Sequence, residues 1–184
     1  MPEILLVIGS LHNGGFNKQL AEHISSEIGE RATVRTLDYS DVPLFNQDTM
    51  HTPPTSVKRV RSDVHKADGV WVVTPEYNGS YPGVLKNLFD WLSISLDPKD
   101  SRGKSAIHGK KTTVSGVGGG QAQGARFHTE EMLKFIRTDV LTDNTSGITP
   151  SRDEWHSGYI DFREEKRKRV IGTHVDAFLD HIGA

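Results

Sequence analysis

Short apolar runs alternate with segments of helical periodicity along most of the chain, and this alternation limits the possible folds more than any other feature. Residues 4–8 (Ile-Leu-Leu-Val-Ile) are all apolar, which is typical of a parallel strand buried on both faces. The run ends at Gly9, and from Asn17 apolar residues recur at spacings of three and four until Gly29. Strands alternating with helices predict crossover units around a parallel sheet.

The same alternation continues toward the C-terminus. It predicts further strands at residues 33–37, 69–74 and 111–115, with a weaker one near Val140. It predicts helices at residues 56–66, 82–93 and 159–182, and a fourth helix that includes residues 129–137. At 184 residues the chain fits one α/β domain, residues 1–184, with five strands whose order the periodicity leaves open.

Composition excludes several classes of protein. The net charge of -2 and the 25% of charged residues fit a soluble globular protein and argue against a nucleic-acid partner. There is no cysteine, which excludes disulfides, thiolate metal sites and a cysteine nucleophile. The N-terminal apolar run lacks a basic flank and is too short for a secretion signal or a membrane span, so we expect a cytoplasmic protein.

Three unusual loops follow three of the predicted strands, at residues 9–17, 75–82 and 116–120. Ligands of open parallel sheets bind at the carboxyl ends of strands, where the winding direction reverses. The first loop is rich in glycine and precedes a helix, so it is a candidate phosphate site. The alternative is a glycine-rich turn with Asn17 as the N-cap. The loop matches neither the Walker pattern nor the dinucleotide fingerprint, which argues against a P-loop nucleotidase.

The second loop, Pro-Glu-Tyr-Asn-Gly, is crowded for a simple connector. Pro75 stiffens the exit of the strand, and we expect the next four amides to face the polar edge of a flat ligand. Pro82 suits the first turn of the following helix. We assign Tyr77 to a binding site and Trp91 to ordinary packing. The third loop has three successive glycines, which favours close approach of a ligand, with a flexible connector as the alternative.

Other signals are weaker. The nine histidines lack zinc-ligand spacing, no serine lies in a G-x-S-x-G elbow, and His12 is the only histidine in a candidate loop. The basic run 163–169 is predicted to be a solvated helical face, with binding of a cofactor phosphate as the minor alternative. Residues 95–109 are predicted to form a long surface loop, and loops of this length are often functional.

Three stretches together resemble a known family. Gly9-Ser-Leu-x-x-x-x-Phe-Asn-x-x-Leu-Ala21, followed by Thr74-Pro-Glu-Tyr-Asn78 and Pro82-Gly-Val-Leu-Lys-Asn-x-x-Asp-Trp-Leu92, is similar to NAD(P)H-dependent FMN reductases, which include azo-dye, quinone and chromate reductases. The resemblance extends over about residues 4–126 and implies a flavodoxin-like, three-layer fold with a five-stranded parallel sheet. It also implies bound FMN, a homodimer or homotetramer, and a contribution of helix 82–92 to the dimer interface.

By position, the resemblance implies three sets of cofactor-binding residues and no metal or acid–base pair. The phosphate would be surrounded by Ser10, His12, Gly15, Phe16 and Asn17. The isoalloxazine would be lined by Pro75, Glu76, Tyr77, Asn78 and Gly79, and its far edge closed by Ser115, Gly116, Gly118 and Gly119. His12 and Gly15 stand where the family often has arginine and serine, which implies a lower affinity for FMN or one that depends on pH. The segment 121–126 resembles the family only loosely.

The activity that this resemblance implies is ping-pong transfer of hydride from NADPH or NADH, through FMN, to a quinone, an azo compound or free flavin. Backbone amides near Tyr77 and Asn78 would stabilise negative charge on the reduced ring. Two alternatives stay open: a flavodoxin-like electron carrier, and a non-redox binding protein on the same fold. Carriers are usually strongly acidic with a Thr/Ser-rich phosphate loop, unlike this chain. A phosphorylation receiver would need acids where Gly9 and Ser10 stand. The sequence does not choose between NADPH and NADH.

Overall fold

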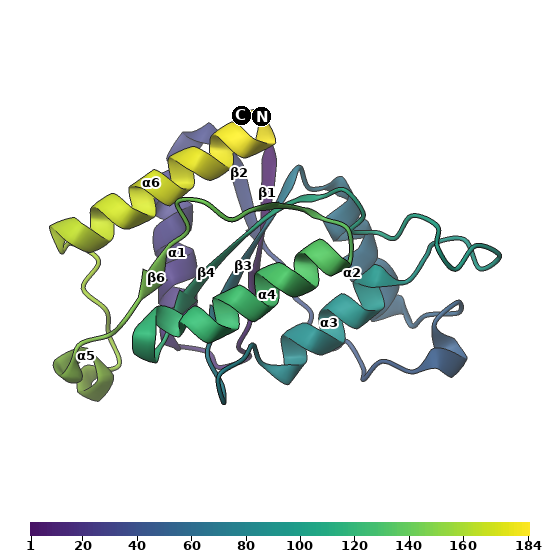
Figure 1. Ribbon diagram of the computed structural model, residues 1–184, viewed down its shortest axis with the longest axis horizontal. Coiled ribbons are helices and arrows are strands. Elements are labelled where there is room, and N and C mark those ends of the chain that lie inside the picture. Colours follow the sequence, from purple (N-terminus) through teal and green to yellow (C-terminus); the bar gives the residue numbers. More distant parts are fainter.

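A parallel sheet with helices on both faces forms the body of the protein (Figure 1). The computed structural model describes residues 1–184. The strands are β1 (Glu3–Ile8), β2 (Thr33–Thr36), β3 (Gly69–Pro75), β4 (Lys111–Val117), β5 (Asp139–Leu141) and β6 (Gly147–Ile148). The helices are α1 (Phe16–Ile28), α2 (Thr55–Lys66), α3 (Gly83–Ser93), α4 (Gln123–Phe135), α5 (Arg152–Ser157) and α6 (Glu165–Ile182).

The strand order is β2-β1-β3-β4-β5, with every pairing parallel. This order reverses direction between β1 and β3, which is where such sheets bind ligands. Two short strands share the position beyond β4. The first half of β4 pairs with β5, and its last two residues, Gly116 and Val117, pair with β6. The outer strand is thus interrupted by residues 142–146.

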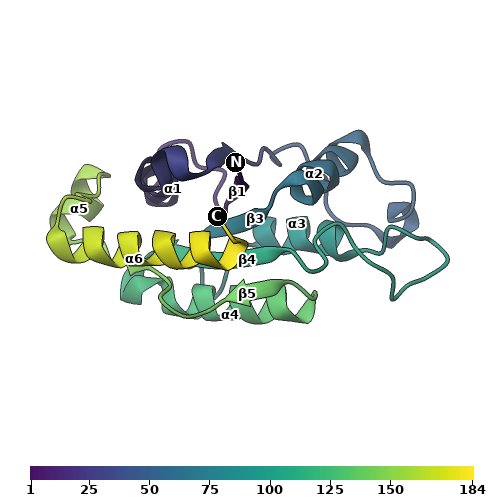
Figure 2. The ribbon, with the colours of Figure 1, turned by 90° about the horizontal axis from the view of Figure 1, so that it is seen from above.

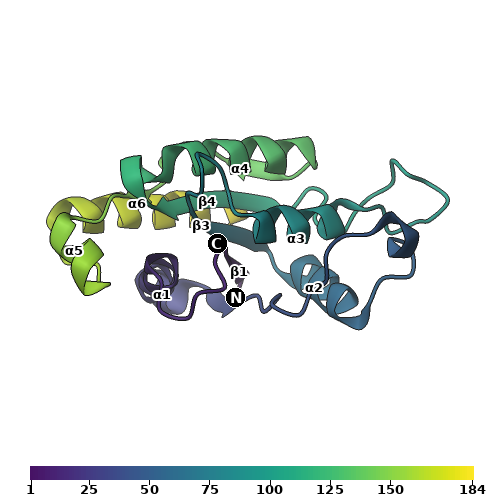
Figure 3. The same ribbon diagram turned by 90° about the horizontal axis from the view of Figure 1, so that it is seen from below.

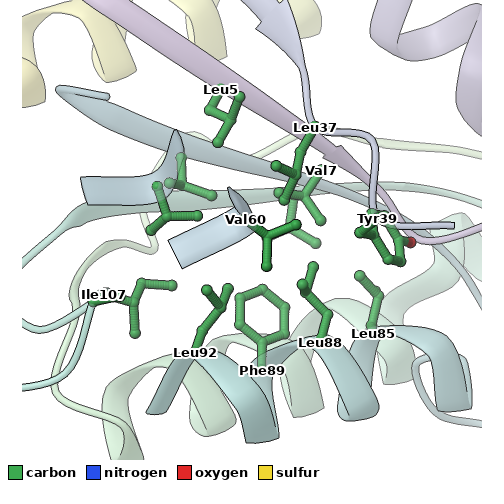
Figure 4. Packing of buried hydrophobic residues seen from close by; sticks show 14 of the residues in the cluster. Leu5, Val7, Leu37, Tyr39, Val60, Leu85, Leu88, Phe89, Leu92 and Ile107 are labelled. Atoms are coloured by element: carbon green, nitrogen blue, oxygen red, sulfur yellow. The ribbon is translucent and has the colours of Figure 1, made fainter. Parts of the chain in front are cut away.

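Each face of the sheet buries its own apolar cluster. One cluster lies under α2, α3 and α4 and includes Val60, Leu88 and Phe89 (Figure 4). The other lies under α1 and α6 and includes Ile24, Trp71 and Phe178. The central strand β3 is buried along its whole length, as its run of apolar residues predicts. The view from above shows the sheet between these helices (Figure 2). No helix has the length and apolar character needed to span a membrane.

The elements predicted from periodicity are present, with differences at the C-terminal third. The fourth helix starts at Gln123, six residues before the predicted segment, and ends at Phe135. The prediction of one helix over residues 159–182 is wrong, because α6 begins at Glu165 after a turn. The sequence analysis also missed β6 and α5. Residues 95–109 form a loop with an exposed tip, but its return arm at Ala106 and Ile107 is buried.

Helix α5 is fixed to α6 through a network centred on Glu154. Ser151 and Glu154 form a capping box at the start of α5. The carboxylate of Glu154 also accepts a hydrogen bond from Arg167 Nη2 at 2.9 Å, and both side chains are nearly buried, at 12% and 14% exposed. Arg167 holds the pKa of Glu154 well below its usual range, at about 2. The basic run 163–169 is therefore not simply a solvated face, because Arg167 is an internal partner of α5.

A buried histidine joins α6 to the interrupted edge of the sheet. His174 is fully buried, and its Nδ1 accepts a hydrogen bond from the backbone N–H of Ser146 at 3.0 Å. Its Nε2 lies 2.7 Å from the hydroxyl of Thr113 on β4. Trp71 packs against the ring, with centroids 4.2 Å apart. Because Nδ1 accepts a hydrogen bond, it carries no proton. The single ring proton is therefore on Nε2, and the imidazole is neutral.

Replacement by alanine should change the stability of the fold in opposite directions at two glycines. A Cβ at Gly172 in α6 would meet only Glu27 Oε1, at 3.6 Å. Gly172→Ala should raise the free energy of unfolding by about 0.5–1 kcal/mol, because glycine is a poor helix former. A Cβ at Gly147 would lie 2.6 Å from the carbonyl oxygen of Gln121. Gly147→Ala should destabilise the fold in the same urea titration, and equal effects of the two changes would contradict this interpretation.

Candidate functional site

An open cavity lies at the carboxyl ends of β1, β3 and β4, at the point where the winding of the sheet reverses. Its volume is about 360 Å³. The lining residues come from all three loops singled out in the sequence and from the segment around α5. They are Ser10, His12, Gly14, Gly15, Phe16, Asn17, Pro75, Glu76, Tyr77, Val117, Gly118, Gly119, Trp155 and Gly158.

The N-terminus of α1, which follows the first loop, lies at this cavity and has unpaired backbone N–H groups. Gly15 is the N-cap of α1, and it provides no side-chain cap. The backbone N–H groups of Phe16 and Asn17 have no partner within the chain, and neither do those of Ser10 and Leu11. These groups and the positive end of the helix dipole form a suitable site for an anion.

Asn17 links the first loop to the end of β4. It is the second residue of α1 and is 6% exposed, so the alternative that makes it an N-cap is wrong. Its Oδ1 accepts a hydrogen bond from the backbone N–H of Val117 at 3.2 Å. This bond holds two walls of the cavity together across 100 residues of sequence.

The second loop is a tight two-residue turn. Asn78 and Gly79 have φ values of 54° and 73°, and Tyr77 and Ser80 exchange backbone hydrogen bonds of 2.9 and 3.1 Å around them. Asn-Gly is the preferred pair for a turn with two positive φ angles. The expectation that all four amides are free is wrong for Tyr77, whose N–H is used in this turn, while those of Glu76, Asn78 and Gly79 have no partner in the chain. Pro82 is the N-cap of α3, one residue before the helix.

Glu76 lines the cavity, and its side chain also caps α4. Its Oε2 accepts a hydrogen bond from the backbone N–H of Ala125 at 3.1 Å. A carboxylate is stabilised at a helix N-terminus by the helix dipole. The neighbouring Gly124 allows this approach, because a Cβ there would lie 2.7 Å from the carbonyl oxygen of Gly79. Glu76 therefore ties the second loop to the third.

The third loop begins after Val117, where β4 ends. Gly120, Gln121 and Ala122 adopt left-handed φ angles of 56°, 63° and 50°. The turn is held by a bond from the Gln121 N–H to Thr149 Oγ1, at 2.8 Å. A Cβ at Gly119 would meet no other atom within 4 Å, so packing within the chain does not require glycine there. Open space beside the cavity favours close approach of a ligand over a flexible connector.

Not every predicted site residue reaches the cavity. Ser115 is fully buried in the sheet, where its Oγ accepts a hydrogen bond from Trp71 Nε1 at 2.9 Å. It points toward His174 because side chains of a strand alternate between faces. Gly116 lies in β4, and a Cβ there would lie 2.9 Å from Ala122 Cβ. Neither Ser115 nor Gly116 lines the cavity, and Asn78 and Gly79 lie beside it, in the turn that follows Tyr77.

The cavity has no lysine or arginine in its lining, and His12 is its only basic side chain. An anion would therefore be held mainly by backbone N–H groups and the dipole of α1. Four lining residues were missed in the sequence: Gly14, Val117, Trp155 and Gly158. The capping-box pattern Ser151-Arg-Asp-Glu154 is a detectable signal for α5. Nothing local in the sequence indicates that α5 lies beside the first loop.

A second, more apolar hollow of about 550 Å³ adjoins the cavity and shares Ser10 and Tyr77 with it. Its other residues come from the first loop, the segment after β2 and the start of α3. They are Gly9, Leu11, Tyr39, Ser40, Val42, Leu44, Pro82, Gly83, Val84 and Asn87. Leu11, Leu44 and Tyr77 are more than half exposed here. The site thus has a polar anion-binding end and an apolar open side.

The strand order and the position of the cavity define a flavodoxin-like α/β protein with its ligand site at the switch point. The chain belongs to the NADPH-dependent FMN reductase family, whose model matches residues 2–148. It is accordingly an oxidoreductase of the kind that uses FMN and a reduced nicotinamide.

Two of the proteins similar in sequence are named as quinone reductases. A 2-hydroxy-1,4-benzoquinone reductase from a Burkholderia species is 38% identical over 153 residues, which is 83% of this chain and 80% of the relative. A quinone reductase from Escherichia coli K12 is 32% identical over 142 residues, covering 76% of this chain and 73% of the relative.

Solved structures agree with the fold. The flavoenzyme FerB, an NAD(P)H:(acceptor) oxidoreductase from Paracoccus denitrificans, superposes with a TM-score of 0.85 at 27% identity, covering 100% of this chain and 98% of FerB. A flavodoxin from the Archaea, 14% identical with a TM-score of 0.56 over 97% of this chain and 99% of that one, shares the fold alone. The predicted flavodoxin-like fold and family are confirmed.

Proposed function

We propose that this protein is a quinone reductase that holds FMN in the cavity and works by ping-pong transfer of hydride from NADPH or NADH. The observation that carries this proposal is the continuity of the cavity, from the unpaired N-terminus of α1 to Pro75 and Tyr77, directly before the turn at Asn78 and Gly79. A ligand with a phosphate at one end and a flat ring at the other matches these two ends. The quinone reductases among the similar proteins support the choice of acceptor.

The residues of the cavity fit FMN. The free N–H groups of Ser10, Leu11, Phe16 and Asn17 would bind the phosphate, with His12 beside them. The unpaired N–H groups of Asn78 and Gly79 would donate to the polar edge of the ring, with Tyr77 and Pro75 beside it. Gly118 and Gly119 would let the chain approach the ring from the third loop. We keep Ser10, His12, Gly15, Phe16, Asn17, Pro75, Glu76, Tyr77, Asn78, Gly79, Gly118 and Gly119 as the proposed FMN-binding set.

When bound, FMN would supply the redox chemistry, accepting hydride from the nicotinamide and passing two electrons to the acceptor. The task of the chain is then to orient the ring and to shield it from water. The N–H groups of Asn78 and Gly79 would stabilise negative charge at the ring edge, because the turn orients these N–H dipoles before the charge develops. The site contains no paired acid and base, and this chemistry needs none. An azo compound or free flavin would reach the same open side.

The apolar hollow beside the cavity suggests an arrangement of subunits. We propose that a second copy of the chain covers Leu11, Leu44 and the start of α3, giving a homodimer or homotetramer. Burial of exposed apolar side chains stabilises such an interface. A single domain over residues 1–184 and a cytoplasmic location stay as proposals, and no nucleic-acid partner is proposed.

The test is a visible absorption spectrum of the protein after FMN is added and the excess is removed. We expect retained flavin absorbance that bleaches on anaerobic addition of NADPH or NADH and returns on addition of a benzoquinone. Flavin that stays bound without bleaching by either nucleotide would instead indicate an electron carrier. If no flavin is retained, FMN binding by this cavity is disproved.

A further inference from the structure

Trp155 is the only tryptophan of this chain with an exposed ring. Trp71 and Trp91 are fully buried, and each donates its indole N–H, to Ser115 Oγ at 2.9 Å and to the carbonyl oxygen of Pro43 at 2.8 Å. Trp155 lines the candidate cavity, is 53% exposed, and makes no hydrogen bond through its indole N–H. Its ring lies edge-on to Phe16, with centroids 5.0 Å apart. A large aromatic surface and a free donor thus lie beside the N-terminus of α1.

The segment that carries Trp155 is held against α1. The side chain of Gln19 donates to the carbonyl oxygen of Gly158 at 2.7 Å and accepts from the N–H of Ile160 at 3.0 Å. On the other side of α5, Glu154 is paired with Arg167 of α6. Seen from below, α5 lies next to the start of α1 (Figure 3). Contacts on both sides fix the position of Trp155 before any ligand binds, which lowers the entropy cost of binding.

This wall of the cavity is added by residues beyond the region that defines the family. The family match ends at residue 148, whereas α5 spans Arg152–Ser157. The part of the cavity next to Trp155 is the anion-binding end, which has no lysine or arginine in its lining. The indole N–H of Trp155 is a hydrogen-bond donor at this end of the cavity, where the first loop supplies no lysine or arginine.

We propose that Trp155 binds FMN directly, packing its ring against the sugar-alcohol chain and donating its indole N–H to the phosphate end. This proposal rests on the proposed function, because it concerns the same cavity. Trp155 is then an affinity-determining residue that the C-terminal segment adds to the site. It takes no part in the transfer of hydride.

The experiment compares FMN dissociation constants of apoprotein variants, measured by the quenching of flavin fluorescence. Trp155→Ala should weaken FMN binding about tenfold, since it removes both the aromatic contact and the donor. Trp155→Phe keeps a ring without the N–H and should fall between Trp155→Ala and the unchanged protein. Tyr159→Ala is the matched control, because Tyr159 is 75% exposed on the same segment but does not line the cavity. It should leave the dissociation constant unchanged.

Several outcomes overturn the proposal without touching the proposed function. If the unchanged protein binds FMN and Trp155→Ala binds it equally well, Trp155 does not contact the cofactor. If FMN affinity is unchanged but the KM for NADPH or NADH rises, the residue contacts the nicotinamide instead. Equal weakening by Trp155→Ala and Tyr159→Ala would indicate a general disturbance of the segment, and circular dichroism would show it. Failure of the unchanged protein to bind FMN would contradict the proposed function itself.

Discussion

Acidification from pH 6.5 toward pH 4 should destabilise this protein steeply, and His174 should account for about one proton of that dependence. Burial lowers the pKa of His174 to about 3, with the nearby Arg126 as a smaller cause in the same direction. Protonation would place a proton on Nδ1, which already accepts the N–H of Ser146. The folded protein therefore resists protonation, while the unfolded chain accepts it near the ordinary value of 6.5.

The sign follows from proton linkage. Between about pH 6.5 and pH 3 the unfolded state binds one more proton at this residue, so the free energy of unfolding falls as pH falls. The slope is about 1.4 kcal/mol per pH unit, and the total approaches about 4 kcal/mol at the acid end of the window. That is a large fraction of the roughly 5–15 kcal/mol typical of a folded domain.

Urea titrations at pH 7, 6, 5 and 4 measure this directly, with His174→Asn as the comparison. The variant loses hydrogen bonds and should be less stable at pH 7, but its stability should fall less with acid, by about one proton. Carboxylates such as Glu154, whose pKa is lowered to about 2, contribute equally in both proteins and cancel in the difference. Parallel pH profiles for the two proteins would show that His174 is not the group responsible.

The second large effect is expected at the phosphate end of the cavity. Asn17→Asp should weaken FMN binding on the order of 100-fold while leaving the fold intact. The carboxylate can still accept the N–H of Val117, as Asn17 Oδ1 does at 3.2 Å. It adds a negative charge where no lysine or arginine offsets it. Two like charges held about 5 Å apart repel by about 3 kcal/mol at an effective dielectric constant of about 20.

Riboflavin, which lacks the phosphate, provides the control for this prediction. Its affinity should change far less than that of FMN in Asn17→Asp. Asn17→Leu should behave differently, because it leaves the buried N–H of Val117 unpaired at a cost of about 1–3 kcal/mol. It should lower thermal stability and weaken both flavins alike. If Asn17→Asp weakens FMN and riboflavin equally, the phosphate does not lie at the start of α1.

The sequence was informative wherever a local pattern decides the structure. The apolar run of β3 and the spacing of apolar residues in α1 are such patterns, and both elements match their predictions. Residues 159–164 contain neither glycine nor proline, yet they form a turn, in which the Asp161 N–H donates to Glu154 Oε1 at 2.8 Å. That contact is tertiary and leaves no periodic signal. The very short β6 was missed for the same reason.

The sequence predicted which loops form the candidate site, but it did not predict the roles of individual side chains in them. The three loops were found because glycine and proline mark unusual backbone next to strand ends. The direction of Ser115 depends on strand phase, and the capping role of Glu76 depends on the start of α4, which the periodicity did not locate. Trp155 was missed because 139 residues separate Gln19 from Gly158, the contact that brings its segment to α1.

The interrupted outer strand has a consequence for behaviour in concentrated solution. A long, regular outer strand offers unpaired N–H and C=O groups to the strands of other molecules and so invites aggregation. Here the row of such groups is split between three residues of β5 and two of β6, and β2 at the opposite side has only four residues. Neither side of the sheet offers a template long enough for a stable intermolecular pairing. The same break that seats His174 therefore also protects the protein from association through its sheet.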